Sequence, residues 1–244
     1  MILELDCGNS FIKWRLRLIE GVARAGVVTR VDEILTDLVE AGIAKITHCR
    51  LVSVRSDAET QKIVDRLSQV LSIRVARAKS SQRLAGVTNA YGDYQRLGLD
   101  RWLAIVGAFS LCGGACMVID IGTAVTVDLV AADGQHLGGY IAPGMGLLRG
   151  QLLSHTSRIQ YGVDEARLAL TNTGPGTSTA EAVERGCLLM LRSYIASQIA
   201  QGELHLEKGF TTYLTGGDAL LVADLPSVSN VPDLVFTGLA LACP

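Results

Sequence analysis

The sequence has none of the features that carry a chain into or across a membrane. Its first ten residues, MILELDCGNS, contain no basic region, and Glu4 and Asp6 interrupt their apolar run, so we expect no signal peptide. The most apolar tracts are too short, or too often interrupted by glycine and polar residues, to span a bilayer. These absences favour a cytoplasmic protein.

Metal-binding patterns are absent as well. None of the six cysteines forms a CxxC pair, and the spacing of Cys112 and Cys116 matches no common zinc site. The four histidines are scattered. We therefore expect reduced, mostly buried thiols at Cys7, Cys49, Cys112, Cys116, Cys187 and Cys243.

The sequence also has no excess of charge of one sign. Charged residues make up 19% of the 244 residues, and the formal net charge is -2, so no basic surface is indicated and nucleic acid is not an expected partner. Hydrophobic residues make up 49%, which is enough for one or two compact domains with a substantial core.

Short apolar runs and turns alternate along the first half of the chain. Helices are predicted over residues 31–42, where apolar residues share one face, and over residues 56–71, which open with a capping box from Ser56 to Glu59. A turn at Glu20–Gly21 separates two of the predicted strands. The strands are predicted over residues 1–5, 11–19, 22–29, 49–54 and 73–78.

The same beginning occurs a second time. A later stretch, MVIDIGTAVTVDLVAADGQHLGGYIAPG, again offers a strand ending in aspartate, a glycine turn, an alternating strand, a tight Asp-Gly turn and a further strand. Asp6 and Asp120 are separated by the same number of positions as Gly8 and Gly122. We interpret this repetition as an internal duplication.

A duplication predicts two similar α/β domains, over residues 1–113 and 114–244, each with a mixed β-sheet flanked by helices. The two strand-end carboxylates would then face each other across a cleft, where they would repel unless a cation lay between them. A metal-bound nucleotide phosphate would supply that cation. The neighbouring Gly, Asn, Ser and Thr residues expose N–H groups and hydroxyls that bind phosphate oxygens.

Three short motifs, taken together, resemble those of the superfamily of actin, the sugar kinases and the Hsp70 ATPases. DCGNS (residues 6–10) is similar to the first phosphate motif, DIGTA (120–124) to the second, and LTGGDA (214–219) to the adenosine motif. The resemblance implies two duplicated actin-like, or ribonuclease H-like, domains with a cleft between them.

Further stretches resemble one subfamily, the type III pantothenate kinases. They are GLDRWLAIVGA (98–108), GGYIAPG (138–144) and GTSTAEAVERG (176–186), and the resemblance runs from residue 3 to about residue 240. The sequence departs from the family pattern at Ser10, where threonine is common, and at Ser178, where asparagine is frequent. In YGDYQRL (91–97) the Asn-Pro that often follows the tyrosine is missing.

This resemblance implies ATP-dependent phosphorylation of pantothenate to 4'-phosphopantothenate, the first step of coenzyme A biosynthesis. Asp100 would act as the general base on the substrate hydroxyl, and Arg101 would pair with the substrate carboxylate. The implied substrate-binding residues are Tyr91, Gly98, Leu99, Asp100, Arg101 and Thr179.

The resemblance also implies a nucleotide site and its cations. Mg²⁺ would accompany ATP near Asp6, and a monovalent cation, K⁺ or NH₄⁺, would bind Asp120. A homodimer is expected, with the helix of Thr179 near its interface. The implied ATP-binding residues are Asp6, Cys7, Gly8, Asn9, Ser10, Phe11, Ile12, Lys13, Thr123, Gly216 and Gly217.

Simpler structural roles remain open for several of these residues. Asp100 also suits the first turn of a helix, Thr179 also suits an N-cap, and Lys13 also suits a solvated strand position. Gly216 and Gly217 also suit a turn between a strand and a helix.

Two glycine-containing stretches have structural interpretations of their own. The stretch GGYIAPGMGLLRG (138–150) is expected to form a shaped loop leading into a helix, either as a wall of the alcohol pocket or as structure alone. Gly186 falls inside a predicted helix, where close helix packing would explain it.

Two other functions also remain open: a kinase of the same superfamily that acts on a sugar or an acyl acid, and a nucleotide-binding regulator without turnover. The phosphate motifs do not separate the two kinases, and only Tyr91, residues 98–101 and Thr179 favour pantothenate. The lack of a basic stripe argues against a regulator that binds DNA.

Overall fold

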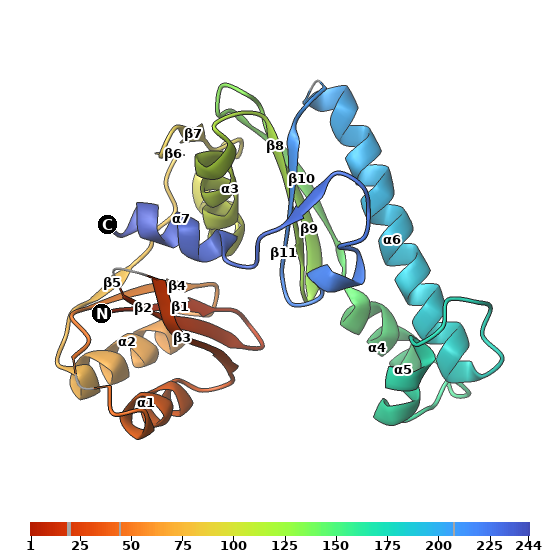
Figure 1. Cartoon of the computed structure of the whole chain (residues 1–244), viewed down its shortest axis with the longest axis horizontal. Coiled ribbons are helices and arrows are strands. Elements are labelled where there is room, and N and C mark those ends of the chain that lie inside the picture. The colour runs from red at the N-terminus through yellow and green to blue at the C-terminus, as the bar shows by residue number, and fades with distance from the viewer. Residues whose placement is uncertain (19–20, 44, 207) are drawn as a thin grey trace. The chain divides into compact units, whose positions relative to one another are not determined.

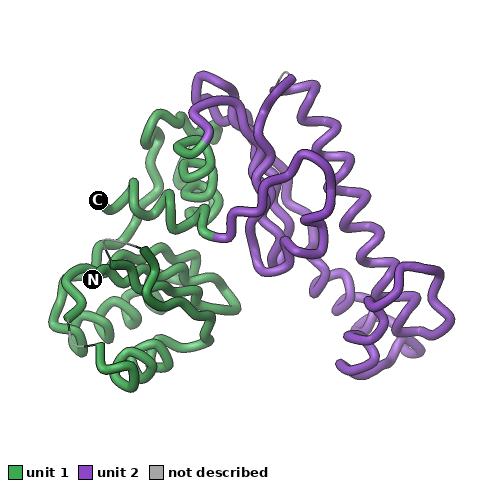
Figure 2. The backbone as a smooth tube through the Cα atoms, in the orientation of Figure 1, with its two compact units in different colours: residues 1–111, 233–244 green, residues 112–232 purple. Residues whose placement is uncertain are grey.

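A computed structural model describes residues 1–18, 21–43, 45–206 and 208–244 (Figure 1). Ile19 and Glu20, where a strand end and a turn were expected, lie outside the described residues. The chain forms two compact units, coloured separately in Figure 2. Unit 1 contains residues 1–111 and 233–244, and unit 2 contains residues 112–232. The last twelve residues thus belong with the first unit, whereas the expected halves place them with the second.

Unit 1 is built on a mixed five-stranded sheet of order β3-β2-β1-β4-β5. Its strand β1 runs antiparallel to β2 and parallel to β4. Alternation sends Leu3, Leu5 and Cys7 of β1 into the core and turns Glu4 and Asp6 to the other face. The strands are β1 (Ile2–Cys7), β2 (Ile12–Leu18), β3 (Gly21–Val28), β4 (His48–Ser53) and β5 (Val75–Arg77).

Two amphipathic helices, α1 (Val31–Glu40) and α2 (Asp57–Leu71), pack on the core face of this sheet. The expected capping box is present at α2, since Ser56 Oγ accepts from the Glu59 N–H at 3.3 Å and the Glu59 carboxylate accepts from the Ser56 N–H at 3.2 Å. The apolar stripes of both helices, with Leu38 and Leu67 at their centres, close the first core.

The rest of unit 1 consists of short elements and two helices, α3 and α7. The helices approach each other at glycines: a Cβ on Gly107 of α3 would lie 2.4 Å from the Leu234 carbonyl oxygen, and one on Gly238 of α7 would lie 2.0 Å from that of Leu103. The elements are β6 (Arg83–Leu84), β7 (Val87–Thr88), η1 (Tyr94–Arg96), α3 (Leu99–Cys112) and α7 (Leu234–Ala242).

Buried charges fasten α7 to the first sheet. Glu4 is fully buried, and its carboxylate accepts from Arg15 Nε at 2.6 Å and from Arg50 Nη1 at 3.2 Å. Arg15 also donates to Asp233, the residue before α7, at 2.7 Å, and its guanidinium stacks over the ring of Phe236.

Unit 2 repeats the topology of unit 1. Its sheet has the order β10-β9-β8-β11-β12, in which β8 again runs antiparallel to the next strand and parallel to the strand on its other side. Two sheets with one topology confirm the expected fold class. The strands are β8 (Cys116–Ile121), β9 (Ala124–Val130), β10 (His136–Pro143), β11 (Thr211–Thr215) and β12 (Val228–Asn230).

The helices of unit 2 are α4 (Met145–His155), α5 (Val163–Ala169), the long α6 (Thr179–His205) and the short η2 (Ala219–Leu221). The apolar stripe of α6, which includes Cys187, Leu191 and Ile195, packs against β8 and β9 (Figure 1). None of the helices in the described ranges combines the length and apolarity that a bilayer crossing requires.

Two expectations for unit 2 are wrong. Residues 138–143 belong to strand β10, the further strand expected after the Asp-Gly turn, so the loop expected over the same residues is wrong, although a helix does follow them. Gly186 lies in α6 as expected, but its Cβ would meet no atom of the chain within 4 Å, so close packing does not explain it.

Candidate active site

The loop after β1 carries the first expected phosphate motif. Asn9, Ser10 and Phe11 are exposed, whereas Cys7 and Ile12 are buried in the sheet. Only the backbone of these two buried residues could therefore meet a ligand. Burial raises the pKa of the Cys7 thiol to about 12, with the nearby Asp6 carboxylate adding to the shift, so Cys7 stays a neutral thiol.

Arg55 fastens this loop, a role that the sequence motifs do not reveal. It follows the end of β4, the parallel neighbour of β1, and its Nε donates to the Gly8 carbonyl oxygen at 2.8 Å. The Val54 N–H donates to the Cys7 carbonyl oxygen at 3.1 Å. The guanidinium thus brings a positive charge to the edge of the loop. Arg55 reaches the loop because β4, which precedes it, pairs with β1.

The loop after β8 holds the corresponding position in unit 2. Asp120 is the second-last residue of β8 and lies on the face opposite the apolar core, as Asp6 does in β1, and Thr123 is exposed in the loop that follows. The Gly144 N–H donates to the Thr123 carbonyl oxygen at 3.1 Å, and a Cβ on Gly144 would lie 2.1 Å from the Gly122 oxygen. The start of α4 is therefore fitted closely against this loop.

Gly216 and Gly217 fold around the end of β8. Strand β11 pairs with β8 so that Thr215 lies opposite Asp120. Gly216 has a φ of +99°, and its Cβ would lie 2.5 Å from Asp120 Oδ1, whereas Gly217 is exposed with no atom within 4 Å of a Cβ position. Asp120, Thr123 and the two glycines thus share one corner of unit 2.

An ion pair between α4 and α6 lies close enough to Asp218 to act on its pKa. Glu184 of α6 is fully buried and accepts from Arg149 of α4 through both oxygens, at 2.5 and 2.7 Å, and from the Tyr161 hydroxyl at 2.9 Å. Burial raises the pKa of Asp218, the residue after Gly217, and the positive charge of Arg149 partly opposes that shift.

The expected substrate residues of unit 1 gather at the start of α3. Arg101 is 8% exposed, and its Nη1 donates to the Tyr91 hydroxyl at 3.4 Å. Asp100 Oδ1 accepts from the Arg101 N–H at 2.8 Å and would lie 2.8 Å from a Cβ on Gly98. Arg101 thus lies in the first turn of α3 with its side chain enclosed rather than at the surface.

Asn89 is a further residue of this cluster that the motifs did not indicate. It is 6% exposed, and its Oδ1 accepts from the Tyr91 N–H at 2.9 Å. In this turn an asparagine side chain bonds the backbone N–H two residues further on. The bond holds the backbone of Tyr91 in place. The Asn-x-Tyr spacing was the available signal for it.

Thr179 is the first residue of α6 and is exposed. It is not the N-cap: that position belongs to Ser178, whose Oγ accepts from the Glu181 N–H at 3.3 Å. Thr179 therefore has its hydroxyl available, beside the open N–H groups of the first helical turn.

Comparison with known proteins identifies the family. The model of the type III pantothenate kinase family matches residues 2–201. The chain belongs to the type III pantothenate kinase family. The type III pantothenate kinases of Ectopseudomonas mendocina and Pseudomonas aeruginosa are 57% and 56% identical to it, over 100% of this chain and 99% of theirs. That of Azotobacter vinelandii is 52% identical over the same shares.

Solved structures share the fold at low sequence identity. A protein from Campylobacter jejuni, assigned to the Baf family of transcriptional activators, aligns with a TM-score of 0.60 and 19% identity over 98% of this chain and 95% of its own. The activator of 2-hydroxyisocaproyl-CoA dehydratase from Clostridium difficile, solved with bound ADPNP, aligns with a TM-score of 0.53 and 14% identity over 99% and 92%. These likenesses concern the fold alone.

Membership of the type III pantothenate kinase family defines the class of reaction. The chain is a phosphotransferase that uses ATP to phosphorylate pantothenate in coenzyme A biosynthesis. This confirms the family and the activity that the motifs implied, and leaves the roles of the individual residues to be assigned.

Proposed function

We propose that Asp100 is the general base of this pantothenate kinase. The observation that carries the proposal is the cluster at the start of α3, where Asp100 stands beside Arg101 and Gly98. A carboxylate there accepts the proton of the pantothenate hydroxyl as its oxygen attacks the γ-phosphorus of ATP, and ADP leaves.

The same cluster suits the other end of pantothenate. Arg101 offers a fork of N–H donors that fits a carboxylate, and its contact with the Tyr91 hydroxyl holds that fork in place. Gly98 leaves room around the base, because any side chain there would collide with Asp100. The proposed substrate contacts are Tyr91, Gly98, Leu99, Asp100, Arg101 and Thr179.

For ATP, we propose that the loops after β1 and β8 bind the phosphates and that Gly216 and Gly217 receive the adenosine. The exposed backbone of the first loop, together with the Thr123 hydroxyl, suits phosphate oxygens. Arg55, bonded to Gly8, adds positive charge to the loop, whereas Lys13 lies half-buried within strand β2 opposite Asp6. The proposed nucleotide residues are Asp6, Cys7, Gly8, Asn9, Ser10, Phe11, Ile12, Lys13, Thr123, Gly216 and Gly217.

Two cations accompany this proposal. Asp6 would contribute to binding Mg²⁺ with ATP, and Asp120 would hold K⁺ or NH₄⁺, because carboxylate and carbonyl oxygens are the ligands that such hard cations take. Within the described ranges no three His, Cys, Asp or Glu side chains gather into a metal site. Such cations would therefore rely on single carboxylates, backbone oxygens and the phosphates themselves. When bound, they neutralise phosphate charge.

We also propose a cytoplasmic homodimer that does not bind nucleic acid. Large apolar side chains are exposed on unit 2, where Leu189 and Met190 of α6 are 66% and 60% exposed and Ile141 of β10 is 66% exposed. Apolar surface of this kind favours association with another chain. The helix that begins at Thr179 would then lie near the interface.

Substitution of Asp100 by asparagine tests the general base. Asp100→Asn keeps the size and one acceptor of the side chain but removes its capacity to take a proton, so kcat should fall at least about a hundredfold. ADP binding, followed by calorimetry, should be unchanged. Coupled ADP release with pantothenate as acceptor measures the rate.

The matched control is Asp93→Asn, in the exposed cap of η1, whose Oδ1 accepts from the Gln95 N–H at 3.2 Å. That variant should retain its kcat. An Asp100→Asn enzyme with wild-type kcat would exclude Asp100 as the base while leaving the family assignment intact.

A further inference from the structure

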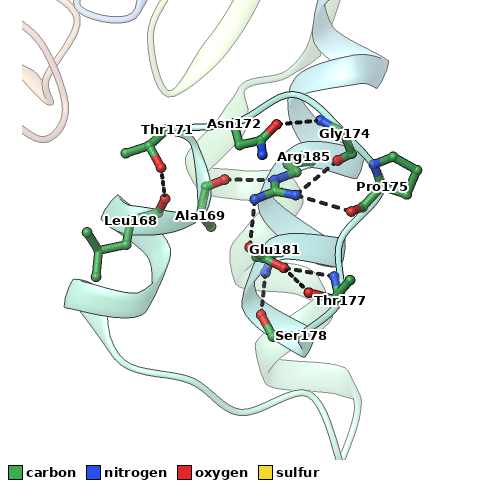
Figure 3. A network of polar contacts seen from close by, with 10 residues as sticks. All are labelled: Leu168, Ala169, Thr171, Asn172, Gly174, Pro175, Thr177, Ser178, Glu181 and Arg185. Atoms are coloured by element: carbon green, nitrogen blue, oxygen red, sulfur yellow. Dashed lines mark hydrogen bonds and ion pairs between the residues drawn. The ribbon is translucent and has the colours of Figure 1, made fainter.

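A network of polar contacts on α6 holds the segment that leads to Thr179 (Figure 3). This segment, residues 170–178, connects α5 to α6. The guanidinium of Arg185 donates to the carbonyl oxygens of Ala169 at 2.8 Å, Gly174 at 3.0 Å and Pro175 at 3.2 Å. One side chain thus bonds the end of α5 and the middle of the segment at once.

Glu181 extends the network to the last residues before the helix. Its Oε1 accepts from Arg185 Nη2 at 2.7 Å, and its Oε2 accepts from the N–H and hydroxyl of Thr177 at 2.8 and 3.0 Å. The hydrogen bonds from Thr177 hold the pKa of Glu181 below its usual range, so the carboxylate stays charged. Arg185 and Glu181 together connect Ala169 to Thr177 (Figure 3).

Gly176 shows how closely the segment lies on the helix. A Cβ there would be 2.4 Å from the Ala182 N atom and 2.6 Å from the Glu181 carbonyl carbon, both backbone atoms that cannot move aside cheaply. The backbone contact at Gly176 and the hydrogen bonds of Arg185 therefore both hold the segment against α6.

No other side chain could make the same set of hydrogen bonds as Arg185. Its side chain is 11% exposed and divides its donors among three carbonyl oxygens and one carboxylate. A planar guanidinium supplies this fork, whereas a lysine ammonium supplies a point charge on a flexible stem. Thr179 follows two residues after Thr177 and begins α6 directly after this segment.

We infer that Arg185 is a positioning residue for pantothenate, acting by holding the segment of residues 170–178 so that Thr179 meets the substrate. The inference rests on the substrate contact proposed for Thr179. Arg185 itself touches the protein and takes no part in the chemistry.

Steady-state kinetics of Arg185→Gln and Arg185→Lys test this inference. Misplacing one hydrogen bond to the substrate should raise the pantothenate KM about tenfold, with kcat and the ATP KM within about twofold of wild type. The lysine variant keeps the charge and tests the fork alone, so it serves if the glutamine variant does not fold. A wild-type pantothenate KM in a folded Arg185 variant would overturn the inference.

Arg192→Gln is the matched control on the same helix. Arg192 also bonds a carboxylate and a carbonyl oxygen, those of Asp224 and Leu221, but lies two turns further along α6. Its loss should leave the pantothenate KM unchanged. A general weakening of α6 would instead raise the KM in both variants and would overturn a role specific to Arg185.

A double-mutant cycle separates the inference from its premise. Because Arg185 is argued to act through Thr179, Arg185→Gln should raise the pantothenate KM little further in a Thr179→Ala background. Additive effects would overturn the inference and leave the Thr179 contact standing. A Thr179→Ala enzyme with wild-type KM would overturn the proposed contact itself, and the inference with it.

Discussion

At the scale of single residues, the fold shifts the pKa values of two carboxylates of unit 2 in opposite directions. Burial raises the pKa of Asp218, beside the proposed adenosine glycines. A hydrogen bond from Arg192 lowers the pKa of Asp224. A raised native pKa means that the native state holds the proton more tightly than the unfolded chain, so ionised Asp218 disfavours folding above its native pKa.

Asp218→Asn should therefore increase the free energy of unfolding at pH 7. The gain should shrink as the pH falls through the native pKa towards the unfolded value of about 3.9, where wild-type Asp218 is itself protonated. Asp224→Asn should do the reverse, lowering stability at pH 7 and less so in acid. Urea denaturation of the ligand-free protein at several pH values measures both, and a less stable Asp218→Asn protein at pH 7 would contradict the assignment.

At the scale of elements, the glycines of two helices have different surroundings. Gly238 lets α7 approach the backbone of α3, because a Cβ there would lie 2.0 Å from the Leu103 carbonyl oxygen. Gly186 of α6 faces open space and meets no such limit from its own chain.

Gly238→Ala should destabilise the protein by about 1–3 kcal/mol, because a backbone oxygen cannot yield to the added methyl group without moving α7. Gly186→Ala should stabilise it by about 1 kcal/mol through helix propensity. Chemical denaturation of the two variants provides the comparison. Equal effects of one sign would show that helix propensity, rather than the crossing of α3 and α7, governs Gly238.

At the scale of the whole molecule, the proposed homodimer makes activity depend on enzyme concentration. If association completes the pantothenate pocket, dilution into monomers should lower the specific activity measured at subsaturating pantothenate. Sedimentation or light scattering over the same concentrations gives the state of assembly, and an inert carrier protein controls for adsorption. Constant specific activity across a measured dissociation would exclude a shared pocket.

Much of this protein was predictable because its signals are local. Asp6 and Asp120 are the second-last residues of equivalent strands in two sheets with one topology, as their repeated Asp-x-Gly patterns indicate. The capping box at Ser56 was also readable, because a cap forms between residues three positions apart. Periodicity and turn chemistry act over a few residues, and the sequence displays them directly.

The duplicated α/β architecture and the family were readable from the residues alone, since each depends on local patterns and on motifs taken in order. The folded chain was needed to show that Arg55 bonds Gly8, that Arg101 is enclosed against Tyr91, and that Arg185 holds the segment before Thr179. The folded chain also shows that the last helix, α7, belongs with unit 1, although it follows the whole of unit 2 in the sequence. A long arginine side chain can find acceptors at many places, and an apolar helix can be buried against many surfaces. Which partner each one meets depends on how distant parts of the chain pack together.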